Sequence, residues 1–468
     1  MVTRKQRTFS LLALCSIGLW NCGNAVVTGG GTPDTRPDTP PEMPPPDDGI
    51  ARYPGTGFVV HEWGTDTIVV GSDGSVQRGL HHEEEDLPGF VYDRMKAGTL
   101  EGSTSVAVKM ETPVTYFYSA VPRKVNVAVG FPQGVFTQWY PAGMTFWPPI
   151  AGPYSVAGLD TPTDPVFNLA FPFSTPACST KYGSVGNGLL DWGAIDILGR
   201  DDTSANLPEA SLETFTWGYA RNVDSNAVRI SQSPGALVQP QDEKFLFYRG
   251  LGNFDLPVRV SIPEGTSVKL ENTYSEAMSK AFVVRVGEGK GVFVAHDGGL
   301  PANSALDTTI PSLEGARDLG TFTNALAEAV TQALDQTGLY HDEALAMVDT
   351  WKRQWFGTPG IRVFYLIPQS WTDASIPLTV TPAPDSSIRV MMIRVEVIAP
   401  EDETIDVNHV QLLQDPATAP EAEAYFQALG RFAEPRLRRA LSILQSPAYA
   451  DSFLAQVTSA ETRVGMGE

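Results

Sequence analysis

The chain has 468 residues and a formal net charge of −21, with 33 basic against 54 acidic side chains. This length is sufficient for two packed domains. The acidity excludes nucleic acid as a partner, because phosphate contacts need clustered lysine and arginine, and it disfavours direct adhesion to an anionic membrane. Only three cysteines are present, so no disulfide framework is expected after processing.

The first 22 residues have the pattern of a secretory signal peptide. A basic segment at residues 4–7 precedes an apolar run, 9–20, that is too short to span a bilayer and remain there. Cys22 follows this run, which resembles the lipobox of bacterial lipoproteins, although Trp20 and Asn21 are larger than lipobox residues usually are. We therefore expect lipidation at Cys22 and an exported, membrane-anchored lipoprotein of the cell envelope, facing the periplasm or the cell surface. The alternative is ordinary signal-peptide cleavage, with Cys22 left free or removed.

Residues 23–52 are expected to form a disordered tether. Their central part, 29–48, is rich in proline and glycine and lacks large apolar residues. Such a segment cannot build a core and favours extended spacer conformations. In this plan the N-terminal lipid is the protein's only contact with the membrane.

The body begins with a β-rich domain, expected over residues 53–310. Its densest β-forming stretch, 106–141, predicts four short strands joined by tight turns into a meander. Residues 124–131 alternate strictly, which predicts a strand with one buried face. Residues 115–119 carry aromatic rings on both faces, which indicates a central strand between two packed layers.

Other parts of this domain are less regular. Residues 57–70 predict one arm of a hairpin that turns at Asp73-Gly74. Residues 142–206 predict a long irregular region, and a further strand is predicted at 213–220. Aromatic residues around 136–147 are expected to be exposed and available to a ligand.

Residues 311–468 are expected to form a helix-rich region with a few strands. Apolar residues at helical spacing predict a helix over 320–337 and a second one ending near Trp355, whose aromatic stripe is expected in the core. Strands are predicted at 361–367 and 387–398, and helices at the C-terminal end. The fold class is therefore α+β: a mostly antiparallel, β-sandwich-like region followed by helices.

Several short blocks resemble those of a family of uncharacterised exported bacterial proteins. The blocks are His61-Glu62-Trp63-Gly64-Thr65, Met110 to Ser119, Phe131 to Pro141, Phe247 to Phe254, and Gly338-Leu339-Tyr340 with Glu343-Ala344. The resemblance runs from about His61 to the C-terminus, so the two regions are expected to pack as one unit. It implies export and carries over no activity.

Two His-acid pairs follow predicted strands and suggest a metal site. His61 and Glu62 follow one apolar run, and His296 and Asp297 follow another. If these strand ends converge, His61 and His296 could bind a divalent metal, with Glu62 or Asp297 as general base. The alternative is that each histidine bonds locally and Glu62 pairs with an arginine. No short metal-binding motif such as HExxH is present.

Other chemically suggestive groups have simpler explanations. The acidic run with two histidines at residues 81–86 is typical of a solvated loop. Cys178 has no histidine near it in sequence, so a nucleophilic role is not favoured. His341 to Glu343 sits where acidic residues stabilise a helix start.

Three functions are compatible with the sequence. The favoured one is a binding protein of the envelope with a protein or glycan ligand. A metal-dependent hydrolase built on the two His-acid pairs is the second, and a structural subunit of a surface assembly is the third. The sequence contains no Gly-x-Ser-x-Gly motif or phosphate-binding loop to name a reaction.

Overall fold

The computed structural model describes residues 57–80, 87–93, 106–147, 186–210, 216–231 and 240–459. The chain divides into two units, Met1–Asp48 and Gly49–Glu468, and every described residue belongs to the second. The expected signal peptide and tether, together with Cys22 and Cys178, lie outside the described residues. Strands dominate the first part of the body and helices its C-terminal part, which confirms the expected α+β fold.

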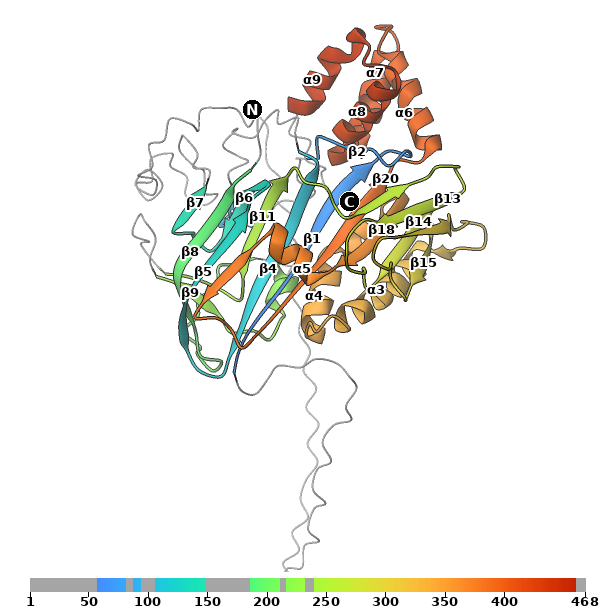
Figure 1. Ribbon diagram of the computed structural model, residues 1–468. Helices are drawn as coiled ribbons and strands as arrows, with labels where there is room; N and C mark the ends of the chain where they lie inside the picture. Colours follow the sequence, from blue (N-terminus) through green and yellow to red (C-terminus); the bar gives the residue numbers. More distant parts are fainter. Residues whose placement is uncertain are drawn as a thin grey trace, which may run out of the picture. The chain divides into compact units, whose positions relative to one another are not determined.

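A mixed sheet forms the centre of the body (Figure 1). Its strands, in order of pairing, are β17 (Arg317–Asp318), β15 (Lys290–His296), β14 (Ala281–Gly287), β18 (Gly360–Ile367), β20 (Ser386–Val397), β1 (Phe58–Val70), β4 (Val108–Ser119), β11 (Leu246–Gly252), β6 (Gly134–Tyr140) and β3 (Tyr92–Asp93), with β2 (Val76–Gln77) pairing with β1. The strands β1 and β20 run parallel, and the other pairs in this sheet are antiparallel.

Strand β1 is central in this sheet and entirely buried. It pairs over residues 59–70 with β20 on one side and over residues 58–67 with β4 on the other. The strands on both sides of the expected boundary at residue 310 therefore share one sheet. A bulge at Gly64 shifts the register with β4, where Thr112 takes a left-handed φ of 55°. A β-branched residue is strained in that conformation.

The predicted meander over residues 106–141 is wrong in its pairing. Strand β5 (Arg123–Phe131) leaves the central sheet and joins a second one, whereas β4 and β6 both pair with β11. The second sheet also contains β10 (Gln241–Glu243), β9 (Val228–Ile230), β8 (Gly188–Ile197), β19 (Leu378–Thr381) and β7 (Thr145–Trp147). The alternation in β5 does give one buried face, and β4 is buried on both faces, as predicted.

Two element predictions between residues 142 and 220 need correction. The region expected to be irregular contains β8, whose alternation is broken at Gly193, a left-handed residue beside a register shift. The segment Trp217–Arg221 is the short helix α2 and not a strand. A third sheet of three short strands, β12 (Val258–Ser261), β13 (Ser267–Asn272) and β16 (Ser304–Thr309), follows further along the chain.

Helices α3 (Leu319–Asp335) and α4 (His341–Trp351) pack against each other and against the central sheet through β15 and β1. Asp318 accepts a hydrogen bond from the Thr321 amide at 3.0 Å and so caps the start of α3. The π-helical turn η3 (Lys352–Phe356) continues α4, and α5 (Gln369–Ser375) lies beside β20. Trp351, Trp355 and Phe356 are buried, which confirms their predicted place in the core.

The last helices form a group with its own apolar core (Figure 1, orange to red). They are α6 (Pro400–Leu412), α7 (Ala419–Ala428), the turn η4 (Gly430–Phe432), α8 (Ala433–Ile443), the turn η5 (Ala448–Ala450) and α9 (Asp451–Ser459). Of these, α6 was not predicted, because its few apolar residues do not recur at helical spacing. None of the helices in the described parts is both long and apolar enough to cross a membrane.

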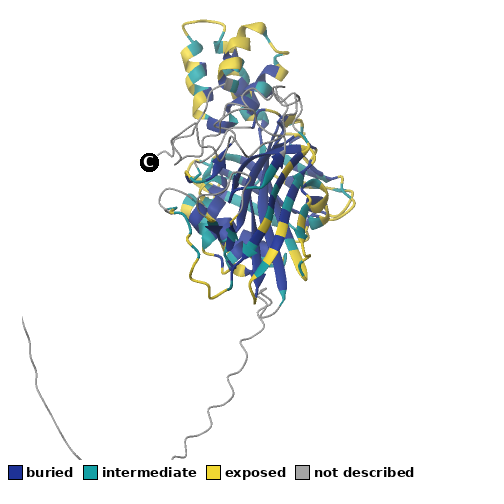
Figure 2. Cartoon of the chain, turned by 90° about the vertical axis from the view of Figure 1, so that its left-hand side faces the viewer, coloured by how far each residue is buried: buried dark blue, intermediate teal, exposed yellow. Residues whose placement is uncertain are grey.

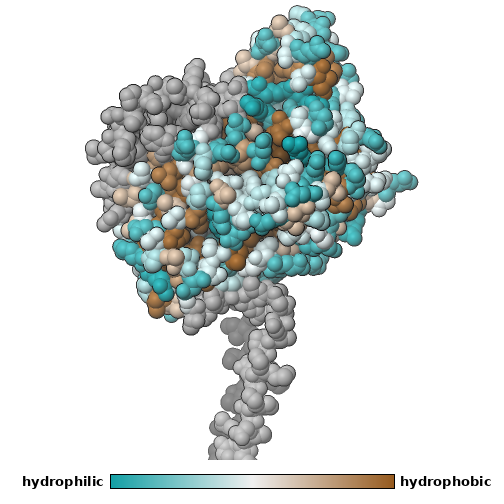
Figure 3. Space-filling view, viewed as in Figure 1, coloured by the Kyte–Doolittle hydropathy of each residue, from teal (hydrophilic) through white to brown (hydrophobic). Residues whose placement is uncertain are grey.

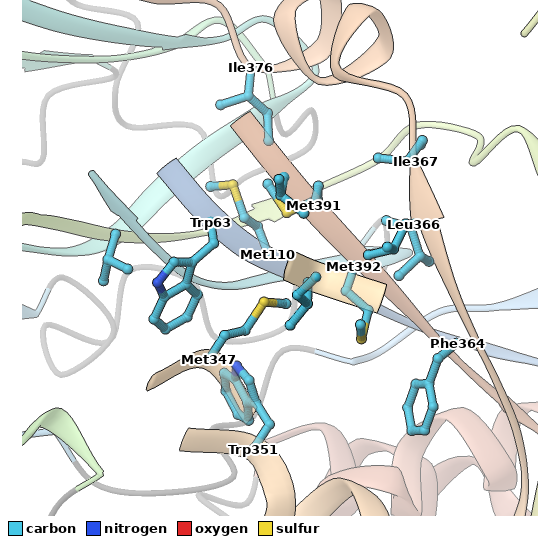
Figure 4. Close-up of a cluster of buried hydrophobic side chains, with 14 of the residues drawn as sticks. Trp63, Met110, Met347, Trp351, Phe364, Leu366, Ile367, Ile376, Met391 and Met392 are labelled. Carbon is cyan, nitrogen blue, oxygen red and sulfur yellow. The ribbon is translucent and has the colours of Figure 1, made fainter. Parts of the chain in front are cut away.

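The sheets carry most of the buried residues, while the helices expose their outer faces (Figure 2). Figure 4 shows part of the main core, where Met347 of α4 lies near the indoles of Trp63 and Trp351. On the face seen in Figure 3, polar and apolar residues are interspersed. The exposed large apolar side chains of the described residues are scattered along the chain, as is ordinary for a protein surface.

Candidate functional site

The predicted site residue His61 lies in a buried network on one face of β1. Its Nδ1 is 2.8 Å from Glu343 Oε2, and the ring packs against Tyr118 and Tyr340. Glu343 also accepts hydrogen bonds from the Tyr340 amide at 2.7 Å and the Tyr118 hydroxyl at 2.6 Å. Burial, reinforced by Glu343, raises the pKa of Tyr118 well above its usual value, so this phenol stays a donor. This contact fastens the start of α4 to β1 and β4.

Glu62 points to the opposite face of β1 and forms the buried ion pair that the alternative interpretation anticipated. Its Oε1 accepts from Arg389 Nε at 2.9 Å and Nη2 at 2.6 Å. Its Oε2 accepts from the Thr115 hydroxyl at 2.9 Å and the Tyr248 hydroxyl at 2.7 Å. Arg389 also donates to Asp373 of α5 at 2.8 Å, and that carboxylate is half exposed.

The charges in this second network support each other. Burial alone would lower the pKa of Arg389, but Glu62, Tyr248 and Asp373 together outweigh it and raise that pKa. Burial, together with Glu62, also raises the pKa of Tyr248 well above its usual value. The arginine therefore stays charged and the phenol protonated, and both serve as donors to one carboxylate.

His296 and Asp297 lie at the end of β15, away from β1. Three strands, β14, β18 and β20, lie between β15 and β1. At the usual spacing between neighbouring strands, β15 and β1 are therefore about 19 Å apart. His296 Nε2 is 2.8 Å from the Thr308 hydroxyl, and burial lowers its pKa despite the opposing charge of Asp297. Asp297 binds Lys280 at 2.6 Å, and this hydrogen bond lowers the pKa of the carboxylate.

The structure thus does not bring the two His-acid pairs together. No group of three or more His, Cys, Asp or Glu residues within the described ranges is placed to hold a metal ion. The separation has a topological cause. His61 and Glu62 lie inside β1 and not at its end, and three other strands of the same sheet lie between β1 and β15. The His-rich acidic run at residues 81–86 and the candidate lipidation site Cys22 fall outside the described residues.

The aromatic residues expected to be exposed near 136–147 are instead buried. Phe136, Trp139, Tyr140 and Phe146 are each at most 4% exposed. Trp139 packs on Phe146 with ring centroids 4.7 Å apart, and Tyr140 lies over Trp217 at 6.1 Å. These rings fill the space around β6, β7 and α2, so they do not provide a ligand surface.

Sequence reasoning missed a further group of buried charges at the other end of β1. Glu111 on β4 accepts from Arg431 of η4 at 2.9 Å, with both side chains at most 2% exposed. Glu396 on β20 accepts from Arg362 at 3.0 Å and Arg394 at 2.6 Å. The available signal was a charged residue inside an apolar run, as in the segment 391–397, because a charge there is buried only with a partner.

A small cleft lies between α2, the end of α4 and the central sheet. Arg249, Phe247, Trp217, Thr112 and Thr350 are among its lining residues. The Arg249 guanidinium is 5.8 Å from the Phe247 ring centroid and donates a weak hydrogen bond to Thr112 at 3.4 Å. The space holds about one water molecule, far less than a ligand pocket requires.

Comparisons with known proteins do not name a family for this chain. No protein-family model matches the sequence. No curated protein matches it significantly. Among solved structures, it is similar to the yeast delta-COP-I mu-homology domain, alone and complexed with a Dsl1 WxWxV peptide, at 8% identity. These alignments cover 73% of this chain and 97% and 98% of the others, with TM-scores of 0.25 and 0.24, and at such scores they carry no argument about fold or function.

Proposed function

We propose that the protein is an exported envelope lipoprotein, lipidated at Cys22, whose body binds a protein or glycan or serves a structural role. The N-terminal pattern of basic segment, short apolar run, cysteine and proline-rich spacer supports the location. The described body contributes a scaffold in which the residues most suggestive of chemistry are used for internal attachment.

One observation carries the choice of a non-catalytic role. A carboxylate beside an imidazole is an arrangement that can orient a catalytic base, but the base must reach its substrate. His61 is 3% exposed, and its Nδ1 contacts Glu343. Glu62 is 1% exposed and divides its two oxygens among Arg389, Thr115 and Tyr248. These contacts suit residues that hold α4, α5 and β20 onto β1.

The metal-dependent hydrolase has no comparable support. It required His61 and Glu62 to meet His296 and Asp297, and three strands separate the two pairs. Elemental analysis of the purified protein tests this directly. We expect the same metal content in the wild type and in the His296→Ala variant. A stoichiometric metal that is lost in this variant would restore the hydrolase hypothesis.

Lipidation is tested by labelling cells that express the full chain with a fatty-acid analogue. We expect label and membrane fractionation for the wild type and for Cys178→Ser, which controls for other cysteine chemistry. The Cys22→Ser variant should lose both. Label that persists in Cys22→Ser, or its absence from the wild type, contradicts the anchor.

The binding role is tested with the full-length protein in detergent. We expect co-sedimentation with isolated cell-wall glycan, or a partner crosslinked in intact cells and confirmed with the purified pair. A structural subunit would instead assemble with itself in light scattering. A monomer that shows none of these contacts and turns over a substrate would overturn the proposal.

A further inference from the structure

One buried acid of β1 takes no part in the networks described above. Asp66 is 0% exposed, and neither of its carboxyl oxygens has a hydrogen-bond partner among the described residues. Carboxylates are almost never buried without a partner, because the charged form loses its hydration. A solitary buried carboxyl group is therefore expected to hold a proton.

The surroundings of Asp66 are apolar or neutral on its own face of the sheet. Asp66 pairs with Met110 of β4 and Ile393 of β20, and Ile393 pairs in turn with Tyr365 of β18. Side chains in one such row point to the same face. Burial raises the pKa of Tyr365 well above its usual value, and the carboxyl group of Asp66 is the next contributor to this rise. This phenol therefore keeps its proton and supplies no charge.

Glu111 on β4 and the cations directed at it lie across the sheet, because Glu111 pairs with Thr65 and its side chain points to the face opposite that of Asp66. Burial alone would raise the pKa of Glu111, but Arg431, then Lys109 and Arg394, outweigh it and lower that pKa. Burial raises the pKa of Asp66 to about 8, and the negative charge of Glu111 adds to the effect. Asp66 therefore lacks both the counterions and the hydrogen bonds that keep Glu111 ionised, so its charged form is strongly disfavoured.

We propose that Asp66 is a solitary buried carboxyl group that keeps its proton at neutral pH, while Glu111 on the opposite face of the sheet carries a charge. This makes Asp66 a proton-binding site that links the stability of the central sheet to pH. Glu111 stays ionised because Arg431 binds that carboxylate directly.

The direction of the linkage follows from the two states. In the unfolded chain an aspartate releases its proton near pH 3.9, whereas Asp66 in the folded protein keeps it up to about pH 8. Between these values the folded state binds one more proton, so its stability falls as the pH rises. The folding equilibrium changes by up to about tenfold per pH unit, and the effect levels off once Asp66 itself ionises.

The test compares unfolding of the wild type and Asp66→Asn in urea from about pH 5 to about pH 9. Asparagine keeps the shape and removes the titration. We expect the free energy of unfolding of the variant to increase relative to that of the wild type as the pH rises. The difference between the two should level off above about pH 8. Asp297→Asn, the same change at an exposed carboxylate, should keep the wild-type profile. A difference between wild type and Asp66→Asn that stays constant with pH overturns the proposal.

A second measurement does not require the variant to fold. The infrared spectrum of the native wild type, with isotope-labelled aspartate, should contain the band of a protonated carboxyl group that disappears near pH 8. If no aspartate band titrates in that range, Asp66 is not the proton carrier. If Asp66→Asn folds, that band should be missing from its spectrum.

Discussion

Breaking a buried ion pair should destabilise the protein far more than breaking an ion pair at the surface. In the Glu62–Arg389 pair both side chains are at most 2% exposed. We expect Arg389→Met to cost about 3–5 kcal/mol, because it leaves a carboxylate buried without its counterion. The double variant Glu62→Leu/Arg389→Met should recover most of that loss, because it removes both charges. Urea unfolding of both variants measures this.

The pair Lys280–Asp297 provides the control, since Lys280→Met leaves behind a carboxylate that is 84% exposed, although Lys280 itself is 14% exposed. Lys280→Met should cost less than about 1 kcal/mol, as is usual for surface ion pairs. If Arg389→Met costs no more than this control, the buried network does not hold β20 and α5 to β1 as described.

Glu396 is expected to give a pH dependence opposite to that of Asp66. Burial would raise its pKa, but Arg362 and Arg394 outweigh burial and lower it. A lowered folded pKa contributes stability that is present above about pH 4.3, the usual value for glutamate, and is lost as the pH falls through the folded pKa. The stability advantage of the wild type over Glu396→Gln should therefore shrink between about pH 5 and pH 3. An advantage that is constant over this range would contradict the assignment.

The sequence allowed part of this site to be predicted. It singled out His61 and Glu62, and it offered an arginine partner for Glu62 as the alternative to a metal. It could not identify that arginine, because Arg389 lies 327 residues from Glu62 in the sequence. It also gave no reason to join His61 to Glu343, since a helix-start glutamate is fully explained by local capping.

At the level of elements, the turn after β15 depends on a glycine. Gly299 has a φ of 64°, and an added Cβ would lie 1.9 Å from the Met278 carbonyl oxygen. Gly265 has a similar φ of 74° but open space around it. We expect Gly265→Ala to cost about 1–2 kcal/mol for the left-handed backbone. Gly299→Ala should cost about 3 kcal/mol or more, because the backbone must also move.

Thermal unfolding of the two variants measures two losses of stability separately. Gly265→Ala gives the loss due to the left-handed backbone, and the additional loss in Gly299→Ala is due to the contact with the Met278 carbonyl oxygen. Equal losses in both variants would mean that the turn at Gly299 relaxes freely. In that case the paired hydrogen bonds between Met278 and Leu300, both 2.9 Å, do not fix it.

Elements with a regular local pattern could be predicted, and those with an interrupted pattern could not. Strand β5 alternates and was predicted, and α3 has its apolar residues at helical spacing. Strand β8 was missed because its bulge at Gly193 interrupts the alternation. The pairing within 106–141 was wrong because the turns between strands do not determine which sheet each strand joins.

At the level of the whole body, we expect a single unfolding transition for residues from about 57 to 399. Strand β1 from the start of the body pairs with β20 from its last third, so neither region keeps its sheet without the other. Calorimetry of the full chain measures this, with equal calorimetric and van't Hoff enthalpies as the criterion. Two transitions separated near residue 310 would instead favour independent domains.

The position of β1 also determines the order in which the protein can be completed. A chain delivered across a membrane from its N-terminus presents β1 first, while its parallel neighbour β20 arrives more than 300 residues later. During that interval a long strand that is buried in the finished protein has one unpaired edge, the kind of surface that associates with other chains. Passage through an export channel would therefore make this protein dependent on a chaperone that shields β1 until the C-terminal third has emerged.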